Sequence, residues 1–246
     1  MALVIIHIDK GAVENTIAEE HRERDVMAIF RREVMAQKIG YANFGAFAAE
    51  LMRLSGYDGS SENPHVRPEY QLSRQEQLQR LLGVDWYYGG WMEDRSIVWS
   101  DTYLKETGNF LHLGIDCSVR AGTEVLAVRD GPVVLVGNDA EFVGGWGGYV
   151  IQRIEYRGQP HALIYAHLGT LLCVPKQHLV AGSTIGMVGN KHENGHWGEH
   201  LHIQLWSGIE GVTDWRAFFS EQDGYGNVAH IDTWAKRCPD PTPLVF

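Results

Sequence analysis

The apolar positions in the first third of the chain follow the period of an amphipathic helix. Spacings of three and four residues place one stripe of side chains on a single helix face: Val26, Ile29, Phe30, Val34 and Met35. A second helix is expected at about 44–54, and the capping-box pattern Ser73–Glu76 opens a third that ends at Gly83. The pattern therefore predicts a helical N-terminal region over residues 1–85.

Beyond residue 85 the helical period fades, and short runs typical of strands alternate with Gly-containing turns. These runs cover residues 124–128, 132–136, 149–156, 162–166, 184–188 and 200–206. Several short strands separated by turns favour an antiparallel sheet of the sandwich or barrel type. We therefore expect an α+β chain, in which the helical region precedes a mainly antiparallel β domain at residues 86–246.

The composition narrows the classes of partner without naming a substrate. The 246 residues carry a formal net charge of −10 and contain no run of five Lys or Arg residues. Nucleic acid is therefore not expected as a partner. Three cysteines, Cys117, Cys173 and Cys238, are too few for a disulfide framework and fit a reducing compartment.

The N-terminal apolar run, Leu3–Ile8, is shorter than the core of a signal peptide, and no basic residue precedes it. No window approaches the ~18 apolar residues of a membrane-spanning helix. The sequence therefore predicts a cytoplasmic protein without a membrane span, with an unconventional export route as the alternative. It does not indicate the oligomeric state.

Candidate chemistry begins with the strand at residues 200–206. Side chains alternate between the two faces of a strand, so Leu201, Ile203 and Leu205 share a core face. His200 and His202 then lie together on the other face. Two surface histidines on a half-buried strand are the alternative interpretation.

Two further pieces add to this strand. His112 and Asp116 are four residues apart and could reach one ion, with Gly114 letting the backbone turn between them. His167 stands at the end of an apolar strand. Two imidazoles and one carboxylate are a usual ligand set for a catalytic zinc, which leaves a fourth position for water. The ion lowers the pKa of that water to about 7.

In order along the chain, the motifs are H-L-G-I-D at 112–116, Y-A-H-L at 165–168 and H-L-H at 200–202. They resemble the lysostaphin/LytM-type zinc metallopeptidases, whose signature is His-x-x-x-Asp followed by His-x-His. The runs at 121–134 and 179–189 also resemble the Gly-Thr-x-Val-x-Ala and Gly-x-x-Ile-Gly segments of that family. The resemblance covers about residues 95–210.

The resemblance implies zinc ligands at His112, Asp116 and His202, and a catalytic pair at His167 and His200. It also implies a twisted antiparallel sheet with the metal in a narrow groove. The implied activity is endopeptidase cleavage of peptidoglycan cross-links or Gly-rich peptides. Which of the two catalytic histidines is the general base is left open.

Some positions depart from this family pattern or compete with it. The segment 190–199 before His-x-His is longer and more charged than usual, so substrate preference could differ. We interpret its His192 and His196 as loop residues, because Gly195 and Gly198 disfavour a helix that would align them. Other expectations form a short set: a groove-lining or packing role for Trp146 and Trp197, an oxyanion contact from Tyr103, and a core position for Cys117.

Two other functions remain as alternatives. A binding or regulatory module could use the same fold without catalysis. A non-haem iron oxygenase also uses two histidines and one carboxylate. Its usual first motif has one residue between His and Asp, whereas three residues separate His112 from Asp116 here.

Overall fold

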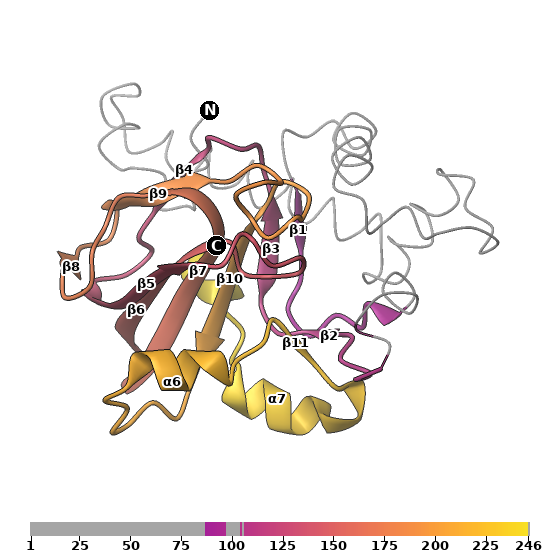
Figure 1. Ribbon diagram of the computed structural model, residues 1–246. Helices are drawn as coiled ribbons and strands as arrows, with labels where there is room; N and C mark the ends of the chain where they lie inside the picture. Colours follow the sequence, from indigo (N-terminus) through magenta and orange to yellow (C-terminus); the bar gives the residue numbers. More distant parts are fainter. Residues whose placement is uncertain (1–86, 97–103, 105, 246) are drawn as a thin grey trace, which may run out of the picture.

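The computed structural model describes residues 87–96, 104 and 106–245 (Figure 1). The helical region expected at residues 1–85 therefore lies outside the described residues. The strands are β1 (Tyr87–Gly89), β2 (Leu111–His112), β3 (Ile115–Ser118), β4 (Glu124–Leu126), β5 (Gly131–Asn138), β6 (Gly148–Tyr156), β7 (Gln159–Leu171), β8 (His178–Leu179), β9 (Thr184–Val188), β10 (Leu201–Trp206) and β11 (Tyr225–Gly226).

The strands build one nine-stranded sheet, and a second, two-stranded sheet pairs β11 with β2. The order in the large sheet is β1-β3-β10-β7-β6-β5-β8, and β7 also pairs with β9, which pairs with β4. The strand pairings of the described residues are antiparallel. The expectation of a mainly antiparallel β fold is thus confirmed for the described residues.

The long hairpin of β6 and β7 forms the centre of the sheet. Its two-residue turn is Arg157-Gly158, with φ of 53° and 74°, and Tyr156 pairs directly with Gln159. Positive φ at both turn residues is typical of a type I′ turn, whose twist matches that of the flanking strands. Apolar residues fill both faces of β7, because helices and strands cover the sheet on both sides.

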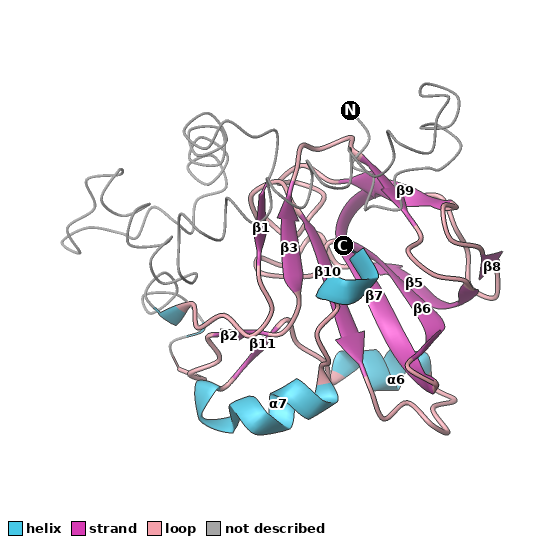
Figure 2. Ribbon diagram, turned by 180° about the vertical axis from the view of Figure 1, so that it is seen from behind, coloured by secondary structure: helices cyan, strands magenta, loops and turns pink. Residues whose placement is uncertain are grey.

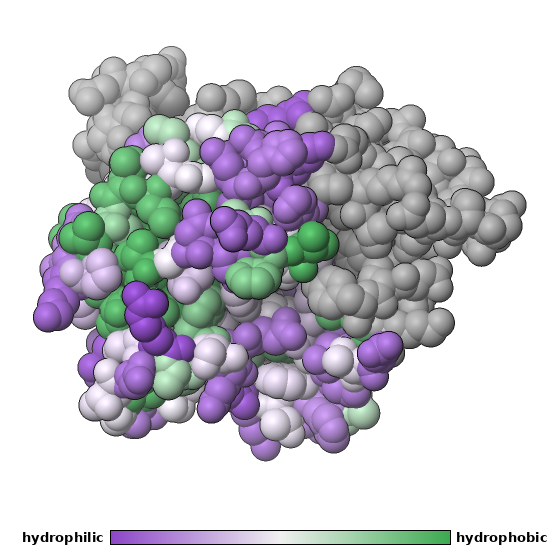
Figure 3. Space-filling model, in the orientation of Figure 1, coloured by the Kyte–Doolittle hydropathy of each residue, from purple (hydrophilic) through white to green (hydrophobic). Residues whose placement is uncertain are grey.

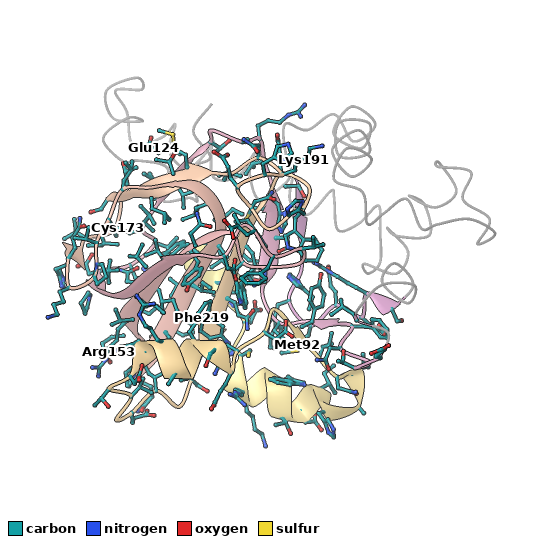
Figure 4. All side chains as sticks on the ribbon, viewed as in Figure 1. Met92, Glu124, Arg153, Cys173, Lys191 and Phe219 are labelled. Atoms are coloured by element: carbon teal, nitrogen blue, oxygen red, sulfur yellow. The ribbon has the colours of Figure 1, made fainter. Side chains whose placement is uncertain are left out.

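Two apolar clusters lie on the two faces of the sheet. One contains Leu163, Tyr165, Leu201 and Leu205, and the other contains Ile164, Trp206 and Phe219. Short helices cover the second face: α6 (Trp215–Ser220) and α7 (Ile231–Arg237) run along one end of the sheet (Figures 1 and 2). Figure 4 shows Phe219 on the α6 side of this layer and Met92 on the α7 side.

The sequence pattern did not predict these short C-terminal helices, which accompany the mainly antiparallel sheet. With η3 (Val228–His230) and α8 (Thr242–Val245), α6 and α7 are too short to show several turns of apolar periodicity. Asp214 caps α6 by accepting hydrogen bonds from the backbone N–H groups of Arg216 and Ala217. Because the helices cover β10, its second face is buried rather than solvent-exposed.

On the face drawn in Figure 3, an apolar patch lies over the part of the sheet where β8 and β9 lie. Exposed side chains there include Leu172, Val174 and Val180. Among the described residues, no helix has the length and apolar character needed to cross a bilayer.

Candidate metal centre

The pairing of β3 with β10 brings the predicted ligands together. In the register of these strands, Asp116 lies directly opposite His202, and His112 precedes Asp116 by four residues at the end of β2. Asp116 Oδ1 is 2.8 Å from His202 Nδ1 and 3.2 Å from His112 Nε2. The two imidazole nitrogens are 3.2 Å apart. Among the described residues, these three form a group able to hold a metal ion.

Gly114 permits this approach for a reason that the sequence analysis did not identify. Its φ lies outside the left-handed region, so a special turn does not explain the glycine. A Cβ at this position would instead collide with the backbone carbonyl of Ile203 and lie 2.8 Å from the His202 ring. The glycine is needed because β10 passes directly beside it.

His112 is held as a neutral ligand. Its Nδ1 lies 3.0 Å from the carbonyl oxygen of Gly90, which can only accept a hydrogen bond. The proton therefore sits on Nδ1, and the lone pair of Nε2 faces the cluster. Burial, followed by the positive charge of Arg95, lowers the pKa of His112 to about 4.

His202 shows the same arrangement with its nitrogens exchanged. Its Nε2 lies 3.0 Å from Gln204 Oε1, while Gln204 Nε2 donates to the carbonyl oxygen of Asp223 at 3.1 Å. The Asp223 carbonyl accepts only, so the amide nitrogen of Gln204 must face it and the amide oxygen must face His202. His202 therefore carries its proton on Nε2 and turns the lone pair of Nδ1 toward Asp116.

Asp116 is ionised in this setting. Burial raises the pKa of its carboxyl group, but the positive charge of the buried Arg95 guanidinium opposes this effect, and the pKa lies well below its usual value. Arg95 Nη1 donates to Asp116 Oδ2 at 2.6 Å. The other oxygen, Oδ1, faces the two histidines.

The donor set fits a divalent cation. With their protons fixed on the far nitrogens, His112 Nε2, His202 Nδ1 and Asp116 Oδ1 are three acceptors within 3.2 Å of one another. Lone pairs at this distance repel one another. A single added proton could form a hydrogen bond within only one of the three atom pairs, so the repulsion in the other two would remain. A tetrahedral zinc with bonds near 2.1 Å would place its ligand atoms about 3.4 Å apart, close to the spacing found here.

His167 and His200 form a second pair beside this cluster, with ring centroids 4.3 Å apart. His167 adopts a left-handed φ of 66° where the pairing of β7 with β6 shifts register between Tyr165 and Leu168. His200 Nε2 lies 3.6 Å from Asp116 Oδ1. Burial lowers the pKa of both rings, and the nearby His200 lowers that of His167 further.

The loop between β9 and β10 fixes the tautomers of this pair. His167 Nδ1 lies 2.9 Å from the carbonyl oxygen of Asn194, and His200 Nδ1 lies 2.8 Å from that of Gly198. Both carbonyls accept the ring proton, so each histidine offers Nε2 as a proton acceptor. Lys191, in this loop, is labelled in Figure 4 near the upper ends of β1 and β3.

Asn194 organises the loop from within. Its side chain is fully buried, and its amide nitrogen donates to the carbonyl oxygens of Gly189, Trp197 and Gly198. Its amide oxygen accepts from the backbone N–H of Trp197 at 3.0 Å. One side chain thus holds the loop segment that supplies a hydrogen-bond acceptor to each histidine of the pair.

The two tryptophans have different surroundings. Trp146 packs inward against His202, Trp206 and Phe219, with ring centroids 5.4–6.1 Å apart. Trp197 donates from its indole nitrogen to the carbonyl oxygen of Gly145 and lies 6.2 Å from the His167 ring. Trp146 is therefore a packing residue beside His202, and Trp197 links two loops next to His167.

The remaining expectations divide into three groups. His192 and His196 lie in the loop, as expected, and neither joins the group formed by His112, Asp116 and His202. Cys117 is buried in the core, as expected. Tyr103 lies outside the described residues.

Sequence reasoning missed the supporting residues of the site, Arg95, Tyr225 and Gln204. Gln204 follows His202 by two on the same strand face, which was a usable signal. Arg95 and Tyr225 come from distant parts of the chain, and only the folded structure brings them to Asp116 and His112.

Residues 110–214 match the model of "Peptidase family M23". An "Uncharacterized metalloprotease" of Haemophilus influenzae is 37% identical over 94 residues, which are 38% of this chain and 18% of that protein. The chain thus spans less than a fifth of that relative's length.

Two solved structures share lower similarity with the chain. The catalytic domain of lysostaphin from Staphylococcus simulans is 23% identical, with a TM-score of 0.38, and the match covers 55% of this chain and 80% of that one. A zinc-containing peptidase from Vibrio cholerae is 26% identical, with a TM-score of 0.33, over 39% of this chain and 27% of that one. The motif order and the convergence of His112, Asp116 and His202 agree with the match of residues 110–214 to peptidase family M23, and this segment is similar to that family.

Proposed function

We propose that the chain is a zinc metallopeptidase that hydrolyses peptide bonds in peptidoglycan-type or Gly-rich peptides. The observation that carries this proposal is the meeting of three acceptor atoms, His112 Nε2, Asp116 Oδ1 and His202 Nδ1, with their protons committed elsewhere. Zinc bound by these residues supplies Lewis acidity toward a peptide carbonyl and toward water.

The adjacent pair accounts for the proton transfers. His167 and His200 are neutral at neutral pH because burial lowers the pKa of each, so either Nε2 can accept a proton from water. The histidine that takes this proton then holds an Nε2–H group. It can pass the proton to the leaving amine or donate a hydrogen bond to the developing oxyanion.

The pair holds one added proton at a time. Its rings are 4.3 Å apart, and a positive charge on His200 lowers the pKa of His167. Protonation of one ring therefore keeps the other neutral. This arrangement suits a reaction in which a single proton moves from the attacking water to the departing amine.

The family supports the substrate class. The catalytic domain of lysostaphin is among the similar structures, and lysostaphin is an antimicrobial peptidase. The loop before His-x-His carries Lys191 and Glu193 and differs from the usual family segment, so we place the specificity of this chain in that loop. We expect peptide substrates and no nucleic acid.

The test is a metal analysis coupled to digestion. The purified full chain is stripped with a chelator, reloaded with zinc, and incubated with murein fragments and with oligoglycine peptides. We expect one zinc per chain and cleavage that disappears on chelation and returns with zinc. His192→Ala, which changes a loop histidine outside the ligand group, is the matched control and should bind zinc normally.

Two outcomes would contradict the proposal. A chain that binds no divalent metal after loading would exclude the metallopeptidase. One zinc per chain without hydrolysis of any peptide or murein fragment would indicate a binding module on the same fold instead.

A further inference from the structure

We infer that Arg95 is a positioning residue that restricts Asp116 to a single metal-facing oxygen. This inference rests on the proposed metal site and adds a residue from outside the family motifs. Arg95 lies in the segment Glu93-Asp94-Arg95, which precedes the first ligand by 17–19 residues, beyond any motif spacing. Arg95 is 3% exposed, and its guanidinium donates to the Asp116 oxygen that does not face His112 and His202.

The contact with Asp116 separates the two carboxylate oxygens. Arg95 Nη1 donates to Oδ2 at 2.6 Å, whereas Oδ1 lies 2.8 Å from His202 Nδ1 and 3.2 Å from His112 Nε2. A short, buried, charge-assisted hydrogen bond is among the stronger side-chain contacts in proteins. Oδ2 is thereby committed to the guanidinium, and Asp116 offers one oxygen to the cluster instead of two.

The guanidinium itself is held at two other points. Its Nη2 lies 3.3 Å from Glu93 Oε2, and its Nη1 donates to the Tyr225 hydroxyl at 3.1 Å. The carboxyl of Glu93 is buried enough that its pKa is raised despite the neighbouring Arg95. The contacts with Glu93 and Tyr225 therefore hold the guanidinium of Arg95 in a defined orientation.

The backbone ties this group to the other ligand as well. The N–H of Met92 donates to the carbonyl oxygen of His112, the N–H of His112 donates to that of Glu93, and the N–H of Arg95 donates to that of Phe110. Gly90, in the same segment, accepts the ring proton of His112. The segment 90–95 thus orients both His112 and Asp116, which a ligand count alone does not reveal.

The consequence is a prediction about coordination. A carboxylate can bind a cation through one or both oxygens, and the choice changes the coordination number. With Oδ2 released, Asp116 can turn both oxygens toward the ion. Lysine keeps the charge but has no planar fork and cannot engage Asp116 and Glu93 in the same geometry. Arg95→Lys therefore separates positioning from charge.

The experiment replaces zinc with cobalt in the full chain and compares wild type, Arg95→Lys and Arg153→Lys. Arg153 is an exposed arginine on β6 and serves as the matched control. Cobalt(II) reports coordination number, because its visible absorption weakens as the number of ligand atoms rises. We expect Arg95→Lys to weaken zinc binding by roughly 10- to 100-fold and to lower the cobalt absorption intensity, with Arg153→Lys unchanged.

A second variant keeps the test decisive if Arg95→Lys does not fold. Glu93→Leu leaves the guanidinium and its contact with Asp116 in place but removes the acceptor at Glu93, and we expect a smaller change in the same direction. Circular dichroism of the metal-free proteins checks the fold in each case.

The possible failures are distinguishable. If wild type binds zinc and cobalt, and the folded variants show the same affinity and the same cobalt spectrum, the inference on Arg95 is wrong and the proposed function stands. If wild type binds neither metal, both are wrong.

Discussion

Two groups of histidines lie side by side in this protein, and the structure holds them in different ways. His112 and His202, with Asp116, are oriented by the segment 90–95, which follows β1 and bridges to β2, and by Gln204 on β10. His167 and His200 are oriented by two carbonyl oxygens of one loop. The first group depends on paired strands, the second on the conformation of residues 190–199.

The difference extends to which nitrogen faces inward. In the strand-held group, His112 turns Nε2 and His202 turns Nδ1 toward the cluster, so the two rings converge from different directions. In the loop-held group, both rings place Nδ1 against a carbonyl and leave Nε2 available. A ligand site needs fixed lone pairs around a point, whereas proton transfer needs two equivalent acceptors next to it. The two supports match these two needs.

The largest expected effect tests whether the two groups differ at all. His202→Ala removes one of three ligand atoms, so we expect the metal content to fall to background. The rate of peptide hydrolysis should fall by more than ~10⁴-fold, because the metal lowers the activation free energy by several kcal/mol. Metal analysis and a turnover assay measure both. Retention of a full equivalent of tightly bound metal would break the distinction by showing that His202 is not a ligand.

The next effect comes from the neighbour two residues away. His200 lies two residues before His202. We expect the His200→Ala variant to keep the metal and to have a kcat lower by roughly 10³-fold, which is the usual loss when a general acid–base group is removed. His167→Ala should behave alike. Equilibrium metal binding and kcat, measured on the same preparations, separate the two groups. If His200→Ala loses the metal as His202→Ala does, the loop-held pair belongs to the ligand set.

The sequence predicts this centre well because its signal is local. Strand alternation placed His200 and His202 beside each other, and the predicted bounds of β9 agree with the structure. The same argument took the second face of β10 as non-core, and this part was wrong. Gln204 and Trp206 on that face are buried under α6 and α7, which are helices too short to show a period.

The supporting residues could not be predicted for a different reason. The pairing of Arg95 with Asp116 spans 21 residues, and that with Tyr225 spans 130. Such contacts depend on the order of strands in the sheet, where β1 joins β3, and on the small sheet of β2 and β11. Local pattern does not encode that order. Gly114 is a similar case. A side chain at this position would collide with β10, which lies far along the chain, so the local sequence does not show why a glycine is required.

A third prediction concerns the metal-free protein in acid, where both groups act in the same direction. Burial lowers the folded-state pKa of His112, to about 4, and also that of His167 and His200. The unfolded chain, with a histidine pKa near 6.5, binds more protons in this range. Stability is therefore fully present above about pH 6.5 and falls as the pH drops toward 4. His112 alone accounts for about 3 kcal/mol.

Denaturant unfolding of the metal-free chain at pH 7.5 and pH 4.5 measures this loss. His112→Asn should reduce the difference between the two pH values, and His192→Asn, at an exposed loop position, should leave it unchanged. Equal stability of the wild type at both pH values would show that the buried rings are already protonated or exposed to water.

The smallest effects give the sharpest separation of the two supports. Gln204→Leu removes the acceptor that fixes the His202 proton, so we expect metal affinity to fall by roughly 10- to 100-fold while kcat of the metal-saturated protein changes little. Asn194→Ala removes the amide that holds the loop, so we expect the opposite result. The kcat should fall by about the same factor, because the tautomers of His167 and His200 are less well fixed, and the metal affinity should stay nearly unchanged.

Both variants also leave buried polar groups without partners, and each costs stability of roughly 1–3 kcal/mol per orphaned group. Unfolding measurements on the metal-free proteins correct for that shared cost. The informative result is the crossing of the two effects: affinity follows the strand-anchored amide of Gln204, and turnover follows the loop-anchored amide of Asn194. If both variants lower affinity and turnover together, the five residues of the centre act as one cooperative unit, and the separation between ligand support and proton-transfer support does not hold.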